Sequence, residues 1–125
     1  MTGTFSIHNK PAVILFDSGA SHSFISAKFG AKVGLDVCQT KGSYMISTPG
    51  GKIASNQIIR LVPVKLGSKI INADLVLLPL EGMDIILGMN WMTMHGVILD
   101  LSSRAVEINS PITEPLPFIY RSGSA

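Results

Sequence analysis

The stretch VILFDSGA, residues 13–20, carries most of the structural information in this sequence. Residues 13–16 are apolar and mostly branched or aromatic, which is typical of a β-strand. Asp17, Ser18 and Gly19 follow at once, and all three residue types are common in turns. The stretch therefore predicts an apolar strand that delivers a carboxylate into a turn, where its hydration is limited.

Two neighbours are suited to hold that carboxylate in place. The hydroxyl group of Ser18 can donate or accept a hydrogen bond. The amide of Gly19 can approach a carboxylate closely because glycine has no Cβ atom. The same tripeptide is also compatible with an ordinary turn in which Asp17 has no chemical role. By itself, the tripeptide leaves both interpretations open.

A second apolar stretch, residues 85–87, also runs into a glycine, Gly88. It repeats the arrangement of residues 14–16, which run into the turn that contains Gly19. As a sequence repeat this is weak. As a pair of strands that each end in a glycine-containing turn, it is the most informative feature outside the first stretch.

Hairpins account for most of the expected β-structure, because pairs of apolar segments flank short turn sequences. The glycines of TPGG, residues 48–51, can supply the positive φ angles of a mobile hairpin tip. The nearly continuous apolar character of residues 57–78 predicts burial on both faces. The expected pairs are 4–8 with 11–16 through Asn9-Lys10, 44–47 with 52–54 through TPGG, 57–66 with 69–78 through Gly67-Ser68, and 97–100 with 105–108 through Ser102-Ser103.

Two short helices are also expected. In residues 23–33 the apolar side chains recur at roughly helical spacing, and Gly34 is placed to end the segment as a C-terminal cap. Gly30 weakens this helix. The second helix is expected to begin at Asn90 and to stop at Gly96.

The composition predicts one globular domain. Of the 125 residues, 46% are hydrophobic and 14% are charged, which is enough to bury a core. We expect the domain to span residues 1–109. The tail, residues 110–125, contains Pro111, Pro115 and Pro117, which suit a linker or an edge segment better than a central strand.

Charge and cysteine content argue against several classes of function. The formal charge of +2 arises from scattered basic residues without a basic run, so no nucleic-acid partner is indicated. Cys38 is alone, so the chain has neither an intrachain disulfide nor a zinc framework, and we expect no metal and no other cofactor. An intracellular, reducing compartment is the simpler expectation. No apolar stretch approaches the roughly 20 residues of a membrane span, and the first residues lack a signal-peptide pattern.

Two carboxylates could hydrolyse a peptide bond without a metal or a covalent nucleophile. The reaction needs a base that takes a proton from water and an acid that protonates the leaving nitrogen. Two carboxylates about 3 Å apart cannot both ionise, so the pair shares one proton and can perform both tasks. One aspartate per chain cannot do this alone.

Other residues that could carry chemistry have simpler interpretations. His22 lies close to Asp17, but adjacent loop residues rarely present a catalytic triad, so we expect a structural or surface role. Trp91, Met92 and Met94 follow an apolar strand and are expected to fill the core.

The segments VILFDSGASHSFI, residues 13–25, and GMDIILGMNW, residues 82–91, resemble the two signature blocks of retropepsins. These are the aspartic proteases of retroviruses and long-terminal-repeat retrotransposons. The blocks look most like those of the Ty3/gypsy branch found in plants. The resemblance covers about residues 4–108 and includes a glycine-rich hairpin at a similar place between the blocks.

The resemblance implies an all-β fold: a closed, mostly antiparallel, retropepsin-like acid-protease barrel lobe with one or two short helices, active as a symmetric homodimer. Asp17 from each of two chains would meet at the dimer axis as the catalytic pair. Ser18 and Gly19 would support the active-site loops, with Ser18 bracing one loop against the other. The residues implied to bind substrate are Gly19, Ala20 and Ile86 in the cleft and Pro49, Gly50 and Gly51 at the tip of a flap.

Two positions depart from the retroviral pattern. Retroviral enzymes usually have an acidic residue where Ser21 stands and an arginine where Met89 stands, and that pair ties the active-site loop to the rest of the dimer. Losing both together avoids an unpaired buried charge. The fold should therefore tolerate the change, whereas the strength of the dimer is put in question.

The expected function is that of an aspartic endopeptidase that hydrolyses peptide bonds in a retrotransposon polyprotein, using water activated by two Asp17 carboxylates. Its partners would be a second identical chain and an extended polypeptide bound by strand-like hydrogen bonds. It would act in the cytoplasm or within virus-like particles. Two alternatives stay open: a catalytically silent dimerisation or peptide-binding domain of the same fold, and an unrelated β-barrel in which Asp17 only caps a turn.

Overall fold

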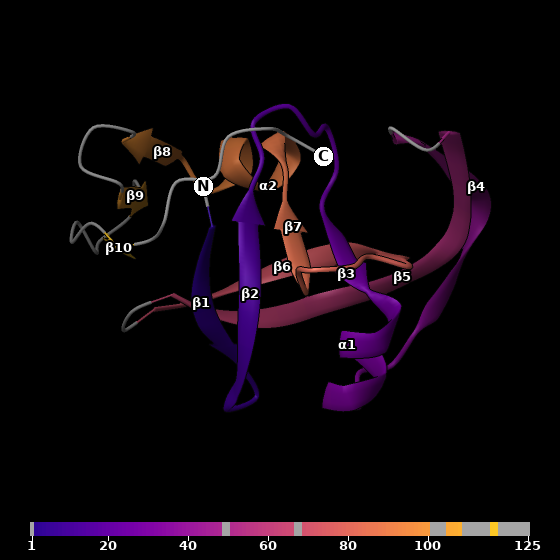
Figure 1. Ribbon diagram of the computed structural model, residues 1–125, viewed down its shortest axis with the longest axis horizontal. Coiled ribbons are helices and arrows are strands. Elements are labelled where there is room, and N and C mark those ends of the chain that lie inside the picture. The colour runs from indigo at the N-terminus through magenta and orange to yellow at the C-terminus, as the bar shows by residue number, and fades with distance from the viewer. Residues whose placement is uncertain (1, 49–50, 67–68, 101–104, 109–115, 118–125) are drawn as a thin grey trace.

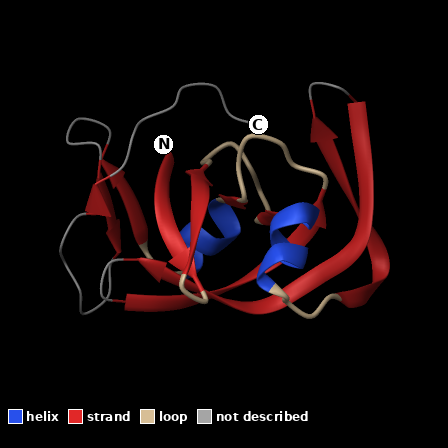
Figure 2. Ribbon diagram, turned by 60° about the horizontal axis from the view of Figure 1, so that its bottom comes forward, coloured by secondary structure: helices blue, strands red, loops and turns tan. Residues whose placement is uncertain are grey.

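The computed structural model describes residues 2–48, 51–66, 69–100, 105–108 and 116–117. In these residues β-strands dominate and two short helices interrupt them (Figures 1 and 2). The expected mostly-β fold with short helices is confirmed. The strands are β1 Thr2–Ile7, β2 Lys10–Phe16, β3 Phe24–Ser26, β4 Cys38–Thr48, β5 Gly51–Leu66, β6 Lys69–Leu78, β7 Ile85–Leu87, β8 Val97–Asp100, β9 Ala105–Ile108 and β10 Leu116–Pro117, and the helices are α1 Ala27–Val33 and α2 Met89–Met94.

The main sheet closes on itself, as the sequence suggested. Its strand order is β1-β2-β7-β3-β6-β5-β4, and β1 also pairs with β5. The closing register joins Ser6 to Lys65 and Ile7 to Val64. In Figure 1, β5 and β6 run across the molecule, crosswise to β2, and the hairpin of β4 and β5 stands at the end of the molecule opposite β8, β9 and β10. Closure leaves few open edges among these strands.

The first hairpin turns one residue earlier than expected. Ile7 is in register with Lys10, so His8 and Asn9 are the turn residues rather than Asn9 and Lys10. Their φ angles are 48° and 64°. A two-residue turn with positive φ at both positions matches the twist of the flanking strands. The turn chemistry therefore places Lys10 in β2.

The long pair of β5 and β6 is not buried on both faces along its whole length, so that expectation was wrong for its outer half. In β5, Val62 and Val64 are buried whereas Lys65 is exposed. In β6, Ile71 is buried, but its neighbour Ile70 is 61% exposed. Side chains of a strand alternate between faces, and only one face of this half contacts the core.

The segment expected to be one helix, residues 23–33, begins as a strand. Phe24 and Ile25 pair with β7, and all of β3 pairs with β6 on its other side, so strand pairing overrides the helical spacing of the apolar residues. α1 then starts after Ser26, whose Oγ accepts a hydrogen bond from the amide of Phe29 at 3.2 Å. It ends as expected at Gly34, which has φ 75°.

The second helix, α2, begins one residue before the expected Asn90, with Gly88 as its N-cap. Its last residue is Met94 and its C-cap is His95, and Gly96 follows with φ 60°. Of the three residues expected in the core, Trp91 and Met92 are each 3% exposed, but Met94 is 78% exposed. Met94 was wrongly assigned because a six-residue helix has only one buried face.

The last hairpin, β8 with β9, forms as expected, while its turn at 102–103 lies outside the described residues. β10 adds to β9 as the edge strand of this small sheet, with Leu116 paired to Val106. The expected domain boundary at residue 109 stays a prediction, because residues 109–115 lie outside the described part as well.

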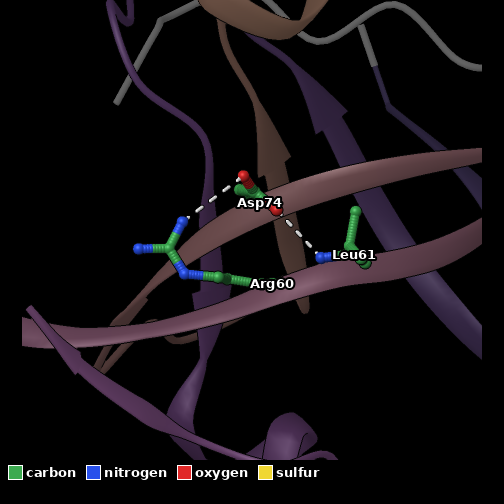
Figure 3. A network of polar contacts seen from close by, with 3 residues as sticks. All are labelled: Arg60, Leu61 and Asp74. Carbon is green, nitrogen blue, oxygen red and sulfur yellow. Dashed lines mark hydrogen bonds and ion pairs between the residues drawn. The ribbon is translucent and has the colours of Figure 1, made fainter.

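A β-bulge interrupts β5 between Ile59 and Val62 (Figure 3). Leu61 has φ 54° in this bulge and is 67% exposed. Its amide donates to Oδ1 of Asp74 at 2.8 Å, and Oδ2 of Asp74 lies 3.9 Å from the guanidinium of Arg60. The side chain of Asp74 on β6 thus replaces a backbone acceptor for an amide that has left the ladder.

Two clusters of buried apolar residues fill the fold. The larger cluster includes Phe16, Trp91 and Met92 together with the buried faces of β5 and β6. Phe16 contacts Trp91 with ring centroids 6.3 Å apart. The smaller cluster lies beside the loop that follows β2 and consists of Leu15, Phe24, Ile58, Val76, Leu78 and Ile86.

Candidate active site

Asp17 follows the last residue of β2 and begins the loop that leads to β3. The residue is only 3% exposed. Its carboxylate oxygen Oδ1 accepts a hydrogen bond from the amide of Gly19 at 2.9 Å. The backbone carbonyl of Asp17 accepts from the amide of Ala20 at 3.2 Å. The turn and the anchored carboxylate are therefore one structure, and Gly19 supplies the anchoring amide.

The two apolar stretches noted in the sequence lie side by side. β2 and β7 pair in parallel, from Ile14 with Ile85 to Phe16 with Leu87. The ladder continues one step further, because the amide of Asp17 donates to the carbonyl of Leu87 at 3.0 Å. The position of Asp17 is thus set by a strand almost seventy residues further along the chain.

Gly88 lies directly beneath the loop that carries Asp17. A Cβ atom at Gly88 would lie 2.2 Å from the carbonyl oxygen of His22 and 2.7 Å from that of Ala20. The φ angle of Gly88 is −94°, so close approach to backbone, and not an unusual φ, requires glycine here. The next amide, that of Met89, donates to the carbonyl of Ala20 at 2.7 Å.

Ser23 connects the other end of the loop to the start of α2. It is 1% exposed. Its Oγ accepts from the amide of Gly88 at 3.0 Å and donates to Oδ1 of Asn90 at 2.8 Å. Oδ1 of Asn90 also accepts from the amide of Trp91 at 2.8 Å. These bonds hold Gly88 and the first turn of α2, where β7 passes into the helix.

Ser21 and Met89, the two positions that depart from the retroviral pattern, make other contacts. Ser21 Oγ lies 3.0 Å from Nδ1 of His22. The side chain of Met89 is 42% exposed, and its backbone makes the contact with the loop. The loop is therefore joined to α2 by backbone hydrogen bonds and by Ser23. An ion pair between positions 21 and 89, as in the retroviral pattern, is not formed.

A cavity of ≈290 Å³ opens beside the loop. Three of the residues expected to bind substrate, Gly19, Ala20 and Ile86, contribute to its lining. Leu80, from the segment before β7, closes it at one side. The complete lining is Gly19, Ala20, Ser21, His22, Phe24, Met45, Ile46, Ser47, Leu78, Leu80 and Ile86.

The remaining expected site residues are placed differently. Ser18 is exposed in the turn, and the brace expected of it involves a second chain and stays a prediction. Pro49 and Gly50 lie outside the described residues. Gly51 begins β5 in register with Thr48, with φ 121°, and it is not among the residues that line the cavity.

Sequence reasoning missed most of the wall opposite the loop. Met45, Ile46 and Ser47 come from β4, just before the expected flap tip, and Leu78 comes from the end of β6. Glycines in the sequence identify the tip of the hairpin of β4 and β5. They do not show which side chains of β4 line the cavity. His22 was given a structural or surface role, and the structure places it in the cavity lining.

A larger cavity of ≈720 Å³ lies between α1, Val13 and the segment before β7. Leu80 lines both cavities. The larger one is bordered by Lys28, Lys32, Glu81 and Asp84, and neither Asp17 nor the loop after it contributes to the lining. The smaller cavity is therefore the one lined by the loop that follows Asp17, although Asp17 itself is not among its lining residues.

Within the described residues, no group of three or more His, Cys, Asp or Glu side chains could hold a metal ion. Cys38 is exposed at the start of β4. None of the helices described is long and apolar enough to cross a membrane.

Comparisons with known proteins agree with this architecture. The family model for the retroviral aspartyl proteases matches residues 1–113. The chain therefore belongs to the retroviral aspartyl protease family. No curated protein matched the sequence.

Two solved structures show the same fold. The retroviral protease-like domain of Ddi1 from Leishmania major superposes with a TM-score of 0.75 at 20% identity, covering 98% of this chain and 95% of that one. The EIAV protease complexed with the inhibitor HBY-793 gives a TM-score of 0.63 at 21% identity, covering 81% and 92%. The expected retropepsin-like fold is thereby confirmed.

Proposed function

We propose that this chain is an aspartic endopeptidase whose active site is completed by a second copy of itself. The observation that carries the proposal is the buried Asp17 carboxylate, held by the Gly19 amide beside a cavity that can receive a side chain. Family membership and the fold support the same activity.

We infer that the second carboxylate comes from another chain, because the other acidic side chains that the structure places lie elsewhere. Asp84 accepts from the amide of Val13, four residues before Asp17 on β2 and so roughly 13 Å away along the strand. Asp74 is bound to the bulge of β5. Glu81 lines the larger cavity, and Asp36 follows α1. The other two acidic residues in the described part of the chain, Asp100 and Glu107, belong to the small sheet of β8 and β9. A symmetric pair of chains is the economical source of the missing group.

In the assembled site one carboxylate would take a proton from the attacking water, and the other would protonate the leaving amide nitrogen. The water oxygen bonds to the carbonyl carbon, and the C–N bond of the resulting tetrahedral intermediate breaks as the nitrogen is protonated. The proton taken from the water replaces the one given to the nitrogen, so the pair again holds one proton. The extended substrate would lie between the loop after β2 and the hairpin of β4 and β5.

We further propose that the substrate is the polyprotein of a Ty3/gypsy-type retrotransposon and that the enzyme works in the cytoplasm or within virus-like particles. The two blocks at residues 13–25 and 82–91 support this origin, because they resemble the plant branch of that group. Expression together with its neighbouring polyprotein segments, followed by mass spectrometry of the fragments, tests the assignment. Fragments cut only outside the polyprotein junctions would contradict it.

Substituting Asp17→Asn tests the activity itself. Wild-type protein should cleave extended peptides and be inhibited by statine-type inhibitors, while the Asp17→Asn protein should show background cleavage and an unchanged thermal unfolding midpoint. An Asp36→Asn variant is the matched control, because Asp36 is exposed and outside the site. Cleavage by the Asp17→Asn protein would overturn the proposal.

A second candidate function is a silent dimerisation or peptide-binding domain. It is favoured by one observation: Ser21 and Met89 leave the loop without the ion pair that would tie it to the rest of a dimer. Sedimentation over a range of concentrations, run beside the cleavage assay, separates the two. Peptide binding without cleavage, by a chain that sediments mostly as a monomer, would favour the silent domain.

A further inference from the structure

The cavity beside Asp17 has an apolar floor and a polar rim. Phe24, Leu78 and Ile86 form the floor, and each is at most 6% exposed. Ser21, His22 and Ser47 line the same cavity and are exposed. One site therefore offers an apolar surface and hydrogen-bonding groups a short distance apart.

The hydrogen bond between Ser21 and His22 leaves an unused donor in the pair. If Oγ of Ser21 donates to Nδ1, the neutral imidazole carries its proton on Nε2. If Nδ1 donates to Oγ instead, the hydroxyl proton of Ser21 is available. In either tautomer one proton can point to a ligand. The pair is therefore suited to an acceptor on the substrate.

The imidazole is also held in orientation. Its ring meets the ring of Tyr44 on β4 edge-on, with centroids 5.4 Å apart and an interplanar angle of 73°. Among the residues that the structure describes, those lining the cavity include no Asp, Glu, Lys or Arg. No carboxylate of this lining competes for the donor, and no Lys or Arg of this lining offers an acidic group an alternative partner.

The size of the cavity suits two side chains of one extended peptide. Its ≈290 Å³ is close to the lower end of the roughly 300–1,000 Å³ typical of ligand pockets. In an extended chain, residues two apart point to the same side, about 6.6 Å from each other. One side chain can then cover the apolar floor while the next on that side reaches the rim.

We propose, building on the proposed protease function, that this cleft selects polypeptides with a large apolar residue and an Asp or Glu two positions away. The apolar side chain lies on Phe24, Leu78 and Ile86. The carboxylate accepts from the Ser21–His22 pair, and hydrogen bonds to ionised acceptors are stronger than those to neutral ones. Met45, which is 65% exposed and flexible, adapts to apolar side chains of different shape.

Binding to the Asp17→Asn protein tests this preference without cleavage. Fluorescein-labelled peptides would keep one Leu and carry Glu, Gln or Lys two residues away, in one series before the Leu and in another after it. Fluorescence anisotropy gives each Kd. In one of the series we expect the Glu peptide to bind about 10-fold more tightly than the Gln peptide, and the Lys peptide to bind most weakly.

Substitutions on the polar rim show which residues cause the preference for Glu peptides. Removing both donors, with Ser21→Ala and His22→Ala together, should bring the Glu-to-Gln ratio of Kd values close to one, and adding His22→Asp should reverse the order so that Lys is preferred. His8→Gln is the matched control, because His8 is exposed in the first hairpin turn and does not line the cavity, so it should leave the ratio as it is. Equal binding of Glu and Gln peptides in both series, or a Glu preference that survives His22→Asp, would overturn the inference.

The proposed function fails on a different result. If the protein with Asp17 intact cuts none of the peptides that the Asp17→Asn protein binds, the endopeptidase proposal is contradicted. The measured ratios would then still decide whether the cleft selects acidic polypeptides.

Discussion

The amide of Asp17 donates to the carbonyl of Leu87 at 3.0 Å, one step beyond the register pair of Phe16 and Leu87. Leu87 is followed by Gly88, which lies under the loop that carries Asp17. The hydrogen bond between Asp17 and Leu87 thus holds the candidate catalytic residue next to Gly88, where α2 begins. The two stretches that resemble the signature blocks of retropepsins are, in space, one structure.

Gly88→Ala should destabilise the protein strongly. The added Cβ would lie 2.2 Å from the carbonyl oxygen of His22, and backbone cannot yield as a flexible side chain does. Overpacking of this kind costs roughly 1–3 kcal/mol or more in the free energy of unfolding. Urea unfolding followed by Trp91 fluorescence measures the change.

Gly42→Ala is the matched control for that experiment, because nothing lies within 4 Å of the position where its Cβ would be added. We expect Gly42→Ala to change the free energy of unfolding by less than about 0.5 kcal/mol. Similar losses for the two alanine variants would refute the role given to Gly88.

Ser23→Ala should cost about 1–3 kcal/mol, because it leaves the buried amide of Gly88 without its acceptor. It should also lower kcat/KM, since the loop after Asp17 loses its tie to Asn90. Ser43→Ala, at an exposed position of β4, is the control and should change neither quantity measurably. Unfolding and cleavage assays that fail to separate the two serines would show that Ser23 is dispensable.

Asp74→Ala should destabilise the protein by about 1 kcal/mol, whereas Arg60→Ala should have an effect near zero. Asp74 accepts the bulged amide of Leu61 at 2.8 Å, and a lost hydrogen bond has a cost of this order. Its distance to Arg60 is 3.9 Å, and both side chains are about half exposed, so the ion pair contributes little. Thermal unfolding of the two variants should rank them in this order, and the reverse ranking would mean that the ion pair holds the bulge.

Much of the fold could be predicted because its signals are local. Turn residues beside runs of branched apolar residues located four hairpins, and Gly34 marked the end of α1. The predictions were wrong where the local structure depends on residues that are distant in the sequence. Residues 24–26 have helical spacing but form a strand, because β6 and β7 pair with them on both sides.

The candidate site was only partly predictable for the same reason. Asp17 and Gly19 stand next to each other in the sequence, so their hydrogen bond follows from a local turn. Ser23 and Gly88 are 65 residues apart in the sequence, and their bond requires that β3 and β7, which follow and precede them, lie side by side. The β4 wall was missed because glycines identify a hairpin tip without showing which side chains face the cavity.

The most direct test of the central claim, that one active site uses Asp17 from two chains, is a mixing experiment. A fixed amount of wild-type protein is incubated with increasing amounts of the Asp17→Asn protein under dimer-forming conditions, and the rate of peptide cleavage is measured. If mixed dimers form at random and are inactive, an equal amount of Asp17→Asn protein lowers the rate to about half, and larger amounts lower it further. A rate that does not change as the Asp17→Asn protein is added would contradict the account.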